Sequence, residues 1–593
     1  MQTLSRIAIT ALWISTSALI LRAQVPLSEQ VVVTAHATPV PFKSLARTAR
    51  VISREQIENL PIQSVADLVR YAASVEVLAR GPYGTQSDFS IRGSTFEQVL
   101  IMVDGVRLNN PQTGHHNGDI PVALHDVDRV EVLYGPGSSL HGADAMAGAI
   151  NIVTRENDSR TEVQLSGGQY GLATASGSIH IPTGPLRRIS AWGERSSGFT
   201  SDRDFRHLGF RVDGGFGETR FQFAHLDKDF GAKGFYGPSP SREWTTHTMA
   251  SVNSPLLHGE KWDLEARAAY RTHGDHFLWD VNRPGFAENF HRDHSVEGGA
   301  VLDWRLADKS RLTLGGNAGG DWIDSSNLGT HRYGRYALSV ELEQKLQDRV
   351  VLYPGIRYDR YSNFGGAWSP SLSGLVWLSP TWKLRSSIGE SFRIPTFTER
   401  YYQDPNHRAE SDLKPERALG IEAGVDWLPS AHWSAFFTAF SRDERDAIDW
   451  VRVSDSERWR TANIRQVQTD GLEIGIRRSF DDASQIELQY TYLDAQLEAE
   501  ELLTKYVSRF PRHSFSAATL FALPLKIRIG HGLAYKRRLD GSSYWVADLR
   551  ASHQFSERVR VFGEISNYLG TEYQEIPGVD MPPRWLRLGL EFR

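Results

Sequence analysis

The chain has 593 residues, which is more than one ordinary globular domain. Its net charge of −5 excludes a broad nucleic-acid-binding surface, and the absence of cysteine excludes disulfides and a lipid-modified N-terminal cysteine. A polar average with 11% aromatic residues and 51 glycines fits two classes of protein. One is a large soluble β-protein, and the other is an outer-membrane barrel whose lumen-facing residues dilute its apolar face.

The first 23 residues have the pattern of a secretory signal peptide. Arg6 precedes an apolar run from Ile7 to Leu21, which suits a signal-peptide core and is short for a membrane span. Ala23 is a suitable residue before a cleavage site, although Leu21 is bulkier than usual two positions earlier. We expect residues 1–23 to be removed on export; the alternative is an N-terminal membrane anchor. No later apolar run is long enough for a membrane helix.

A short valine-rich segment, EQVVVTA, occupies residues 29–35. Consecutive valines favour an extended strand. No hairpin turn follows, because the chain continues into HATPVPFKS, which is rich in proline and small residues. The sequence therefore predicts a strand without a partner nearby in the chain.

Residues 36–156 have the pattern of a compact mixed α/β unit. SREQIENL predicts a helix with a capping box, in which Ser53 is the N-cap and Gln56 lies three residues on; SVADLVRYA repeats this pattern. QVLIMVDGVRLNN predicts a hairpin with an Asp-Gly turn. DRVEVLYGPGSSLHGADAMAGAINIVT begins and ends as a strand and is rich in glycine between them.

From about residue 160 to the end, segments recur in which hydrophobic and polar residues alternate. In the closing RWLRLGLEFR, the residues from Leu586 to Phe592 place leucine and phenylalanine on one face and arginine, glycine and glutamate on the other. YALSVELEQ and RVRVFGEIS repeat the alternation. A charged second face suits a water-filled lumen, so the pattern favours a membrane barrel; a soluble sandwich or propeller would alternate similarly.

Several stretches, taken in order, resemble the TonB-dependent outer-membrane receptors. EQVVVTA resembles the energy-coupling segment of that family, the TonB box. FSIRGSTFEQVLIMVDGVRLNN and DRVEVLYGPGSSLHGADAMAGAINIVTRE resemble the two signature stretches of its plug domain, and GESFRIPTFTERYYQDPNHRAESDLKPERALGIEAGV resembles its late barrel motif. The nearest subgroup is the small receptors similar to the cobalamin (vitamin B12) receptor. Arg593 departs from the family pattern, because these barrels usually finish on an aromatic residue.

The resemblance implies an all-β membrane fold with two parts. Residues 157–593 would form a 22-stranded antiparallel transmembrane β-barrel, at roughly 20 residues for each strand with its loop. Residues 36–156 would form a mixed α/β plug domain inside the lumen, preceded by an N-terminal segment, 24–35, that carries the TonB box. The implied setting is the Gram-negative outer membrane, in contact with lipid and as a monomer, with no nucleic acid bound.

The resemblance also implies a partner, an inner-membrane energy-coupling protein of the TonB type. Such a protein adds the box as a strand to its own sheet, so that backbone hydrogen bonds provide most of the binding. The predicted contact residues are Glu29, Gln30, Val31, Val32, Val33, Thr34 and Ala35. We expect the box to be partly free, and more so with cargo bound; the alternative is that it joins the sheet of the plug. A signalling relative would carry a further domain before the box, whereas only Gln24–Ser28 follow the expected cleavage point.

Three stretches offer candidate contacts to a substrate. NNPQTGHHNGD would be an apical plug loop, RGPYGTQSD is a second plug stretch, and DKDFGAKGFYGPSPSREWT would be an extracellular loop. Their donors, acceptors and aromatic rings suit a polar or flat ligand. The candidates are Tyr83, Gln112, Thr113, His115, His116, Asn117, Phe235 and Tyr236. The alternatives are a loop braced against the barrel wall and, for the last two, an aromatic belt at the membrane interface.

Charged plug positions and possible metal ligands complete the candidate residues. Arg92, Arg129 and Glu131 resemble buried plug positions of the family, and we expect them to support plug stability or release more than to contact cargo. Paired histidines such as those in the apical loop could ligate a metal, but adjacent residues seldom share one site well. The other histidine candidates, for haem or metal in a predicted outer loop, are His273, His276, His291 and His294. Solvated loop histidines are commoner than such sites.

Calcium also has candidate ligands, and these are weak. Asp202 and Asp204 lie two residues apart, which suits calcium, but Arg203 stands between them. The sequence does not predict a bound cofactor. It also contains no G-x-S-x-G, H-E-x-x-H or G-x-x-x-x-G-K motif, so we do not expect an enzyme.

A passive porin or adhesin barrel is the rival from another class. Residues 36–156 and the TonB box argue against it, because a porin has no use for either. The resemblance therefore implies active uptake of a scarce nutrient. Cobalamin or a related corrinoid comes first among the cargoes and a ferric siderophore second, followed by haem, other metal complexes and small glycans.

Overall fold

The structure, a computed structural model, describes residues 31–593 except 33, 37–39, 157–158, 498–501 and 508. The predicted signal peptide, residues 24–28, and Glu29, Gln30 and Val33 of the TonB box lie outside the described residues. In the described part of the chain, no helix combines the length and the apolar character needed to cross a membrane.

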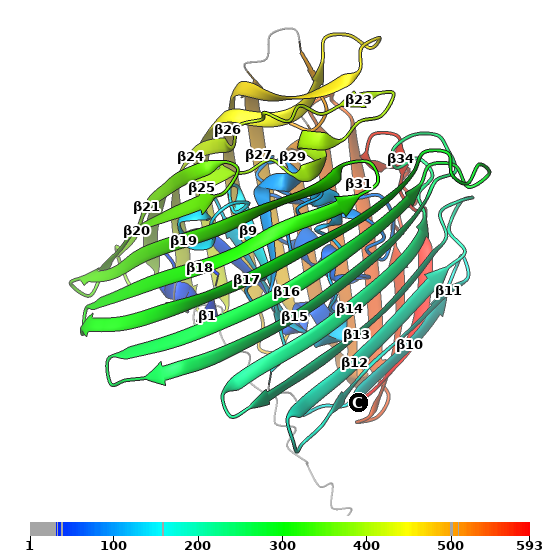
Figure 1. Cartoon of the computed structure of the whole chain (residues 1–593). Helices are drawn as coiled ribbons and strands as arrows, with labels where there is room; N and C mark the ends of the chain where they lie inside the picture. The colour runs from blue at the N-terminus through cyan, green and yellow to red at the C-terminus, as the bar shows by residue number, and fades with distance from the viewer. Residues whose placement is uncertain (1–30, 33, 37–39, 157–158, 498–501, 508) are drawn as a thin grey trace, which may run out of the picture.

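The C-terminal part of the chain is one closed antiparallel sheet (Figure 1). It closes where β10 pairs with β35, with Val163 opposite Phe592. Apart from the two-residue strands β23 and β28, the sheet has 22 strands in the described residues, as predicted. The strands are β10 (Glu162–Gly168), β11 (Leu172–His180), β12 (Leu186–Ser196), β13 (Phe205–Phe216), β14 (Thr219–Gly231), β15 (Arg242–His258), β16 (Trp262–Leu278), β17 (Glu288–Ala307), β18 (Ser310–Ser325), β19 (Gly329–Leu346), β20 (Val350–Tyr361), β21 (Gly365–Trp377), β22 (Trp382–Arg393), β23 (His407–Arg408), β24 (Glu416–Ser430), β25 (Trp433–Arg452), β26 (Trp459–Ser479), β27 (Gln485–Leu497), β28 (Leu503–Thr504), β29 (Pro511–Leu523), β30 (Ile527–Arg538), β31 (Ser543–Gln554), β32 (Val559–Ser566) and β35 (Trp585–Phe592).

The two faces of the barrel wall differ as the alternation predicts. Leu338 and Leu588 point outward and are 67% and 60% exposed, whereas Glu341 and Arg587 point inward and are buried. An apolar outer face and a polar inner face are what a strand needs between lipid and a hydrated, plugged lumen. Closure leaves no unpaired sheet edge, which in hydrocarbon would cost several kcal/mol for each unsatisfied backbone group.

The two ends of the barrel have different connections. At one end short turns join the strands, as between Phe216 and Thr219. At the other end the connections are longer, as between Arg393 and Glu416, and they carry α4 (Phe397–Tyr401), β33 (Gln574–Ile576) and β34 (Val579–Asp580). In outer-membrane barrels the short turns face the periplasm and the long loops face outward. The C-terminus lies at the short-turn end, opposite β23 and β34 (Figure 1).

A mixed α/β unit lies inside the ring of strands, where its elements are drawn in blue and cyan (Figure 1). Its main sheet has the order β3-β8-β9-β6-β7, with β6 parallel to β9, and β4 pairs with β5. Both predicted capping boxes and the Asp-Gly hairpin β6–β7 are present. Its elements are β1 (Val31–Val32), β2 (Val40–Pro41), η2 (Phe42–Ser44), β3 (Ala49–Ile52), α1 (Arg54–Asn59), α2 (Val65–Leu68), η3 (Val69–Tyr71), β4 (Val75–Ala79), β5 (Ser87–Ile91), η4 (Phe96–Gln98), β6 (Val99–Val103), β7 (Val106–Arg107), η5 (Gly114–His116), η6 (Leu124–Asp126), β8 (Val127–Tyr134), α3 (Ser138–His141) and β9 (Gly148–Thr154).

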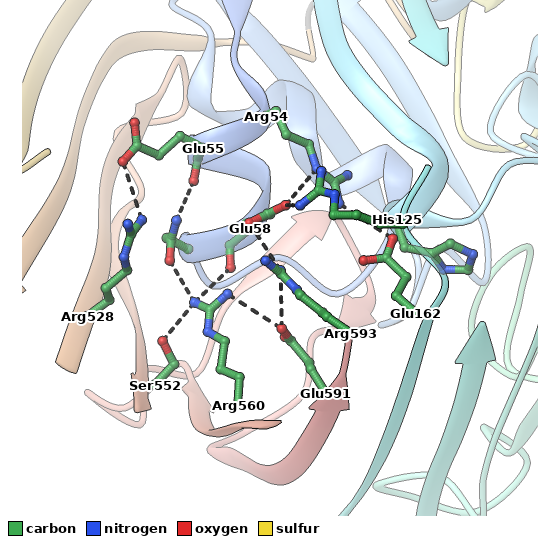
Figure 2. A network of polar contacts seen from close by, with 12 residues as sticks. Arg54, Glu55, Glu58, His125, Glu162, Arg528, Ser552, Arg560, Glu591 and Arg593 are labelled. Atoms are coloured by element: carbon green, nitrogen blue, oxygen red, sulfur yellow. Dashed lines mark hydrogen bonds and ion pairs between the residues drawn. The ribbon is translucent and has the colours of Figure 1, made fainter. Parts of the chain in front are cut away.

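Apolar packing and ion pairs hold this plug against the wall. The largest buried cluster combines plug side chains with Ala224, Met249 and Leu520 of the barrel. At the C-terminal end of the barrel, Arg593 pairs with Glu58 of α1 at 3.1 Å, and Arg560 donates to Asn59 at 2.6 Å (Figure 2). The departure from the family pattern at the last residue therefore adds a contact between barrel and plug.

The described part of the TonB box is docked, in contrast to the expectation of a partly free segment. Val32, Thr34 and Ala35 are buried. The prediction of a strand without a nearby partner is also wrong, because Val31 and Val32 pair antiparallel with Pro41 and Val40. This pairing forms its own two-stranded sheet and does not extend the main sheet of the plug.

Candidate functional site

The predicted apical loop follows the β6–β7 hairpin and reaches the long-loop end of the barrel. It contains the short 3₁₀ helix η5, whose N-cap Thr113 accepts a hydrogen bond from the backbone N–H of His115 at 3.4 Å. Asn117 accepts from the backbone N–H of Asn110 at 2.8 Å, which closes the base of the loop. These two candidates therefore shape the loop from within.

His115 is at the centre of a cluster that combines both predicted plug stretches. Its ring stacks on Phe96 with centroids 4.3 Å apart, and its Nδ1 lies 2.9 Å from a carboxylate oxygen of Asp88. Arg80 donates to the other oxygen of Asp88 at 2.8 Å. Burial alone would raise the pKa of Asp88, but Arg80 and His115 outweigh it and lower the pKa to about 2. Burial lowers the pKa of His115 to about 4, so the ring is neutral and Nε2 accepts when Nδ1 donates to Asp88.

Two tyrosines from barrel loops surround His115. Tyr236 is 40% exposed, and its hydroxyl accepts a hydrogen bond from Gln86 at 2.7 Å. The ring of Tyr506 stands edge-on to Phe96 at 5.0 Å, and its hydroxyl lies 3.5 Å from Nε2 of His115. We call His115, Tyr236 and Tyr506 the apical aromatic cluster. It is a mixed apolar and hydrogen-bonding surface at the outward end of the plug.

Tyr83 and Phe235 are placed differently from this cluster. Both belong to a buried group that includes Phe205 and Trp585, and the ring of Tyr83 stacks on Phe205 at 5.5 Å. Phe235 is 5% exposed and lies under the guanidinium of Arg203. In this arrangement both rings brace the plug and an outer loop against the barrel, and neither offers a free face to a ligand.

Gln112 and His116 point from the apical loop into the barrel wall. Gln112 donates to Asp275 at 2.9 Å, and Nε2 of His116 lies 3.3 Å from the same carboxylate. Nδ1 of His116 lies 3.9 Å from Glu243. All four side chains are buried. The two neighbouring histidines thus have different surroundings. His115 lies at the outward end of the plug, and His116 lies against the barrel wall.

The charged plug positions contact the barrel or the box. Arg92 forms a bidentate ion pair with Glu473, at 2.9 and 2.8 Å, and donates to Glu422 at 2.7 Å. Glu131 accepts hydrogen bonds from the backbone N–H and the hydroxyl of Thr34, at 3.0 and 2.8 Å. Arg129 donates to the other oxygen of Glu131 at 2.9 Å.

The four candidate histidines do not form one site, and they do not lie in an outer loop. These residues lie on strands β16 and β17, where successive side chains point to opposite faces. His273 and His291 are buried in the lumen, whereas His276 stacks between Trp244 and Phe290 on the outer face. His294 stacks on Trp322. Because side chains alternate between the two faces of a strand, histidines that are close in the sequence lie on opposite sides of the barrel wall.

Basic side chains contact the two weak calcium candidates. Arg242 donates to Asp204 at 3.1 Å, and Nζ of Lys233 lies 3.6 Å from Asp202. These cations already balance the carboxylates that a calcium ion would need. Calcium therefore gains no support at this position.

Sequence reasoning missed the barrel side chains that complete the site. Tyr506 comes from the loop between β27 and β29, far from the plug in sequence, and no motif marks it. Two plug residues were missed as well. Arg80 and Asp88 are the ends of the predicted stretch RGPYGTQSD, and their opposite charges could have predicted an ion pair there. Glu243 and Asp275 could have been found only from their inward position on predicted strands.

Comparison with known proteins bears on this arrangement. The family model described as TonB dependent receptor-like, beta-barrel matches residues 155–568, and the TonB-dependent Receptor Plug Domain matches residues 41–149. The chain belongs to the TonB-dependent receptors. As a TonB-dependent receptor it is a transport protein of the Gram-negative outer membrane and not an enzyme. The resemblance and the fold read from the sequence are thereby confirmed.

The relatives of this TonB-dependent receptor have names that refer to different substrates or conditions. The vitamin B12 transporter BtuB of Vibrio vulnificus is 27% identical over 484 residues, covering 76% of this chain and 75% of the relative. The iron-regulated outer membrane virulence protein of Vibrio cholerae is 24% identical over 560 residues, covering 82% of this chain and 81% of the relative. The siderophore receptor PirA of Acinetobacter baumannii shares the fold, with a TM-score of 0.76 at 15% identity over 93% of this chain and 98% of PirA. The family implies a TonB partner and a small-molecule cargo.

Proposed function

We propose that this receptor takes up cobalamin or a related corrinoid by energy-coupled transport, as a monomer whose apolar outer face contacts lipid. The observation that carries the proposal is the apical aromatic cluster at the outward end of the plug. A corrinoid is a flat macrocycle with amide substituents, which suits aromatic faces beside hydrogen-bonding groups. Similarity over three quarters of the chain to a vitamin B12 transporter supports the same cargo class.

In this proposal, cargo binding and energy coupling occur at opposite ends of the plug. Cargo contacts Tyr236, His115 and Tyr506 from outside. The TonB box, residues 29–35, pairs with the periplasmic partner as an added strand, so that backbone hydrogen bonds bear the load. Cargo shifts the equilibrium between docked and released box by as much as its affinity for the two states differs.

A ferric siderophore is the second candidate, because cations adjoin the same cluster. The guanidinium of Arg509 lies 5.3 Å from the ring centroid of Tyr506, and Nζ of Lys505 lies 5.5 Å from it. Cationic side chains beside aromatic rings suit an anionic iron chelate.

Uptake in a receptor-deficient strain that expresses this chain separates the two cargoes. We expect accumulation of radiolabelled cobalamin only when the TonB partner is present. Accumulation of ferric siderophores without cobalamin would contradict the corrinoid proposal and favour the second candidate. Accumulation of either compound without the partner would contradict energy coupling.

A pair of tyrosine substitutions tests the placement of the binding surface. Tyr506→Ala should lower cargo affinity by about 3- to 10-fold, since aromatic contacts of this kind contribute about 0.5–1.5 kcal/mol. Tyr490→Ala is the matched control, because Tyr490 lies on the outer face of β27 and contacts His513. Equal affinities in binding assays of both variants would exclude Tyr506 from the site.

A further inference from the structure

A second group of polar side chains lies deeper than the apical aromatic cluster, between the plug and the wall. It consists of His116 from η5, Glu243 from β15 and Asp275 from β16. One ligand atom from each of the three lies within 4.8 Å of the others. Their exposed fractions are 5%, 2% and 7%, so solvent screens this group only weakly. We call these three residues the wall triad.

The wall triad contains polar atoms that the protein does not satisfy. Among the described residues, Oε2 of Glu243 and Oδ1 of Asp275 have no hydrogen-bond partner. Oε1 of the adjoining Gln112 is likewise buried without one, while its amide nitrogen holds Asp275. An unsatisfied buried oxygen costs about 1–3 kcal/mol, and more when it is charged. Several such oxygens around one imidazole therefore need a further partner.

Lys228, a basic side chain whose charge acts on Glu243, already has two partners outside the wall triad. Lys228 donates to Asp119 at 2.6 Å and to the backbone carbonyl of Gly84 at 2.7 Å. The other oxygen of Asp119 lies 2.9 Å from Nε2 of His273. Asp119 and His273 form a second possible group with His116. Within the described part of the chain, both carboxylate oxygens of Asp119 have partners, although Nδ1 of His273 has none, whereas Glu243 and Asp275 each keep one oxygen without a partner. The wall triad is therefore the more open of the two groups.

We propose that the wall triad binds a divalent transition-metal ion, with Zn²⁺ as the best match. One ring nitrogen of His116 and one oxygen each from Glu243 and Asp275 supply three ligands, and Gln112 or water supplies the fourth. Imidazole with carboxylates is a usual ligand set for Zn²⁺, whereas Ca²⁺ and Mg²⁺ prefer oxygen ligands alone. The ion would tie the apical loop of the plug to strands β15 and β16. This inference does not depend on which cargo the receptor takes up.

Metal titration of the purified receptor tests the proposal. The full chain, without a histidine tag, is extracted in detergent, stripped with a chelator and titrated with Zn²⁺ by calorimetry. Co²⁺ serves as a second probe, because its visible absorption reports the coordination geometry. We expect one tight site for each chain, and an affinity about 100-fold or more lower for His116→Ala and for Glu243→Gln/Asp275→Asn, since even outer-shell changes cost 10- to 100-fold.

A matched variant and a diffraction measurement exclude simpler explanations. His276→Ala removes a histidine from the outer face of β16 and should bind Zn²⁺ as the unaltered chain does. Anomalous diffraction from crystals soaked in Zn²⁺ should place the ion between His116, Glu243 and Asp275, and it requires no variant to fold. The proposal is wrong if the unaltered chain shows no tight site, if His116→Ala keeps full affinity, or if the ion lies elsewhere.

Discussion

The buried carboxylate of Glu131 connects the plug to its proposed coupling segment. Glu131 is fully buried and accepts two hydrogen bonds from Thr34 of the TonB box. Asn151 donates to the hydroxyl of Thr34 at 3.1 Å, and Nε2 of His141 lies 2.9 Å from its carbonyl oxygen. Hydrogen bonds to a charged acceptor are about twice as strong as neutral ones. Glu131, which we expected from the sequence to support plug stability or release, thus contacts Thr34 of the box directly.

Neutralising this carboxylate should loosen the box. In Glu131→Gln the acceptor loses its charge, so we expect docking to weaken by about 1–2 kcal/mol and the undocked fraction to rise by about 10-fold. The chain has no cysteine, so the thiol of an Ala35→Cys variant is the sole labelling site. Its labelling rate should rise in Glu131→Gln and stay unchanged in Glu557→Gln, which alters an exposed turn. Equal rates in all three backgrounds would show that Glu131 does not hold the box.

Among the elements, β1 is the one whose pairing changes during transport in the proposed coupling. It pairs with β2 over two residues only, Val31 with Pro41 and Val32 with Val40. So short a pairing offers few hydrogen bonds, and an added strand from a partner can replace them. Buried contacts of Val32 and Ala35 with the plug core complete the docking.

Proline in place of Val32 tests the role of the backbone of β1. Val32→Pro removes a backbone donor and should abolish active uptake while cargo still binds at the apical end. Val32→Ala keeps the backbone N–H and should retain most of the uptake, because the pairing depends little on the side chain. Unchanged accumulation of labelled cargo by cells with Val32→Pro would refute the coupling role of this segment.

The elements also show what the sequence could predict. The capping box at Ser53 and the hairpin turn at Asp104 depend on neighbouring residues, so both were predicted correctly. The pairing of β1 with β2 depends on burial of Val32 against the plug, which no local pattern reveals. The histidines of β16 and β17 were assigned to a loop because polar lumen-facing residues dilute the apolar signal of a strand. Tyr506 reaches the candidate site only through closure of the barrel.

In the whole molecule, charged contacts between plug and wall oppose release of the plug. Arg92 bridges Glu473 and Glu422, and Arg593 bridges α1 to the closing strand of the barrel. Removing one partner of a buried ion pair, such as Arg92 with Glu473, costs about 3–5 kcal/mol, so the contacts of Arg92 resist a pull on the box. The pair of Arg593 with Glu58 is only partly buried and contributes less. A cavity of about 740 Å³ lies between plug and wall and is lined in part by Thr34 and His36. Because Thr34 belongs to the box, undocking the box would remove part of the lining of that cavity.

The central claim is that the plug lies inside the barrel, and a disulfide between the two tests it most directly. The hydroxyl oxygens of Ser74 in the plug and Thr491 on β27 are 3.0 Å apart. Thiols in their places can approach the disulfide bond length of about 2.05 Å. Because the chain has no other cysteine, oxidation of intact cells that carry Ser74→Cys/Thr491→Cys should give one intramolecular disulfide, found as a linked peptide by mass spectrometry. Two thiols that stay free and accessible to labelling after oxidation would contradict the account.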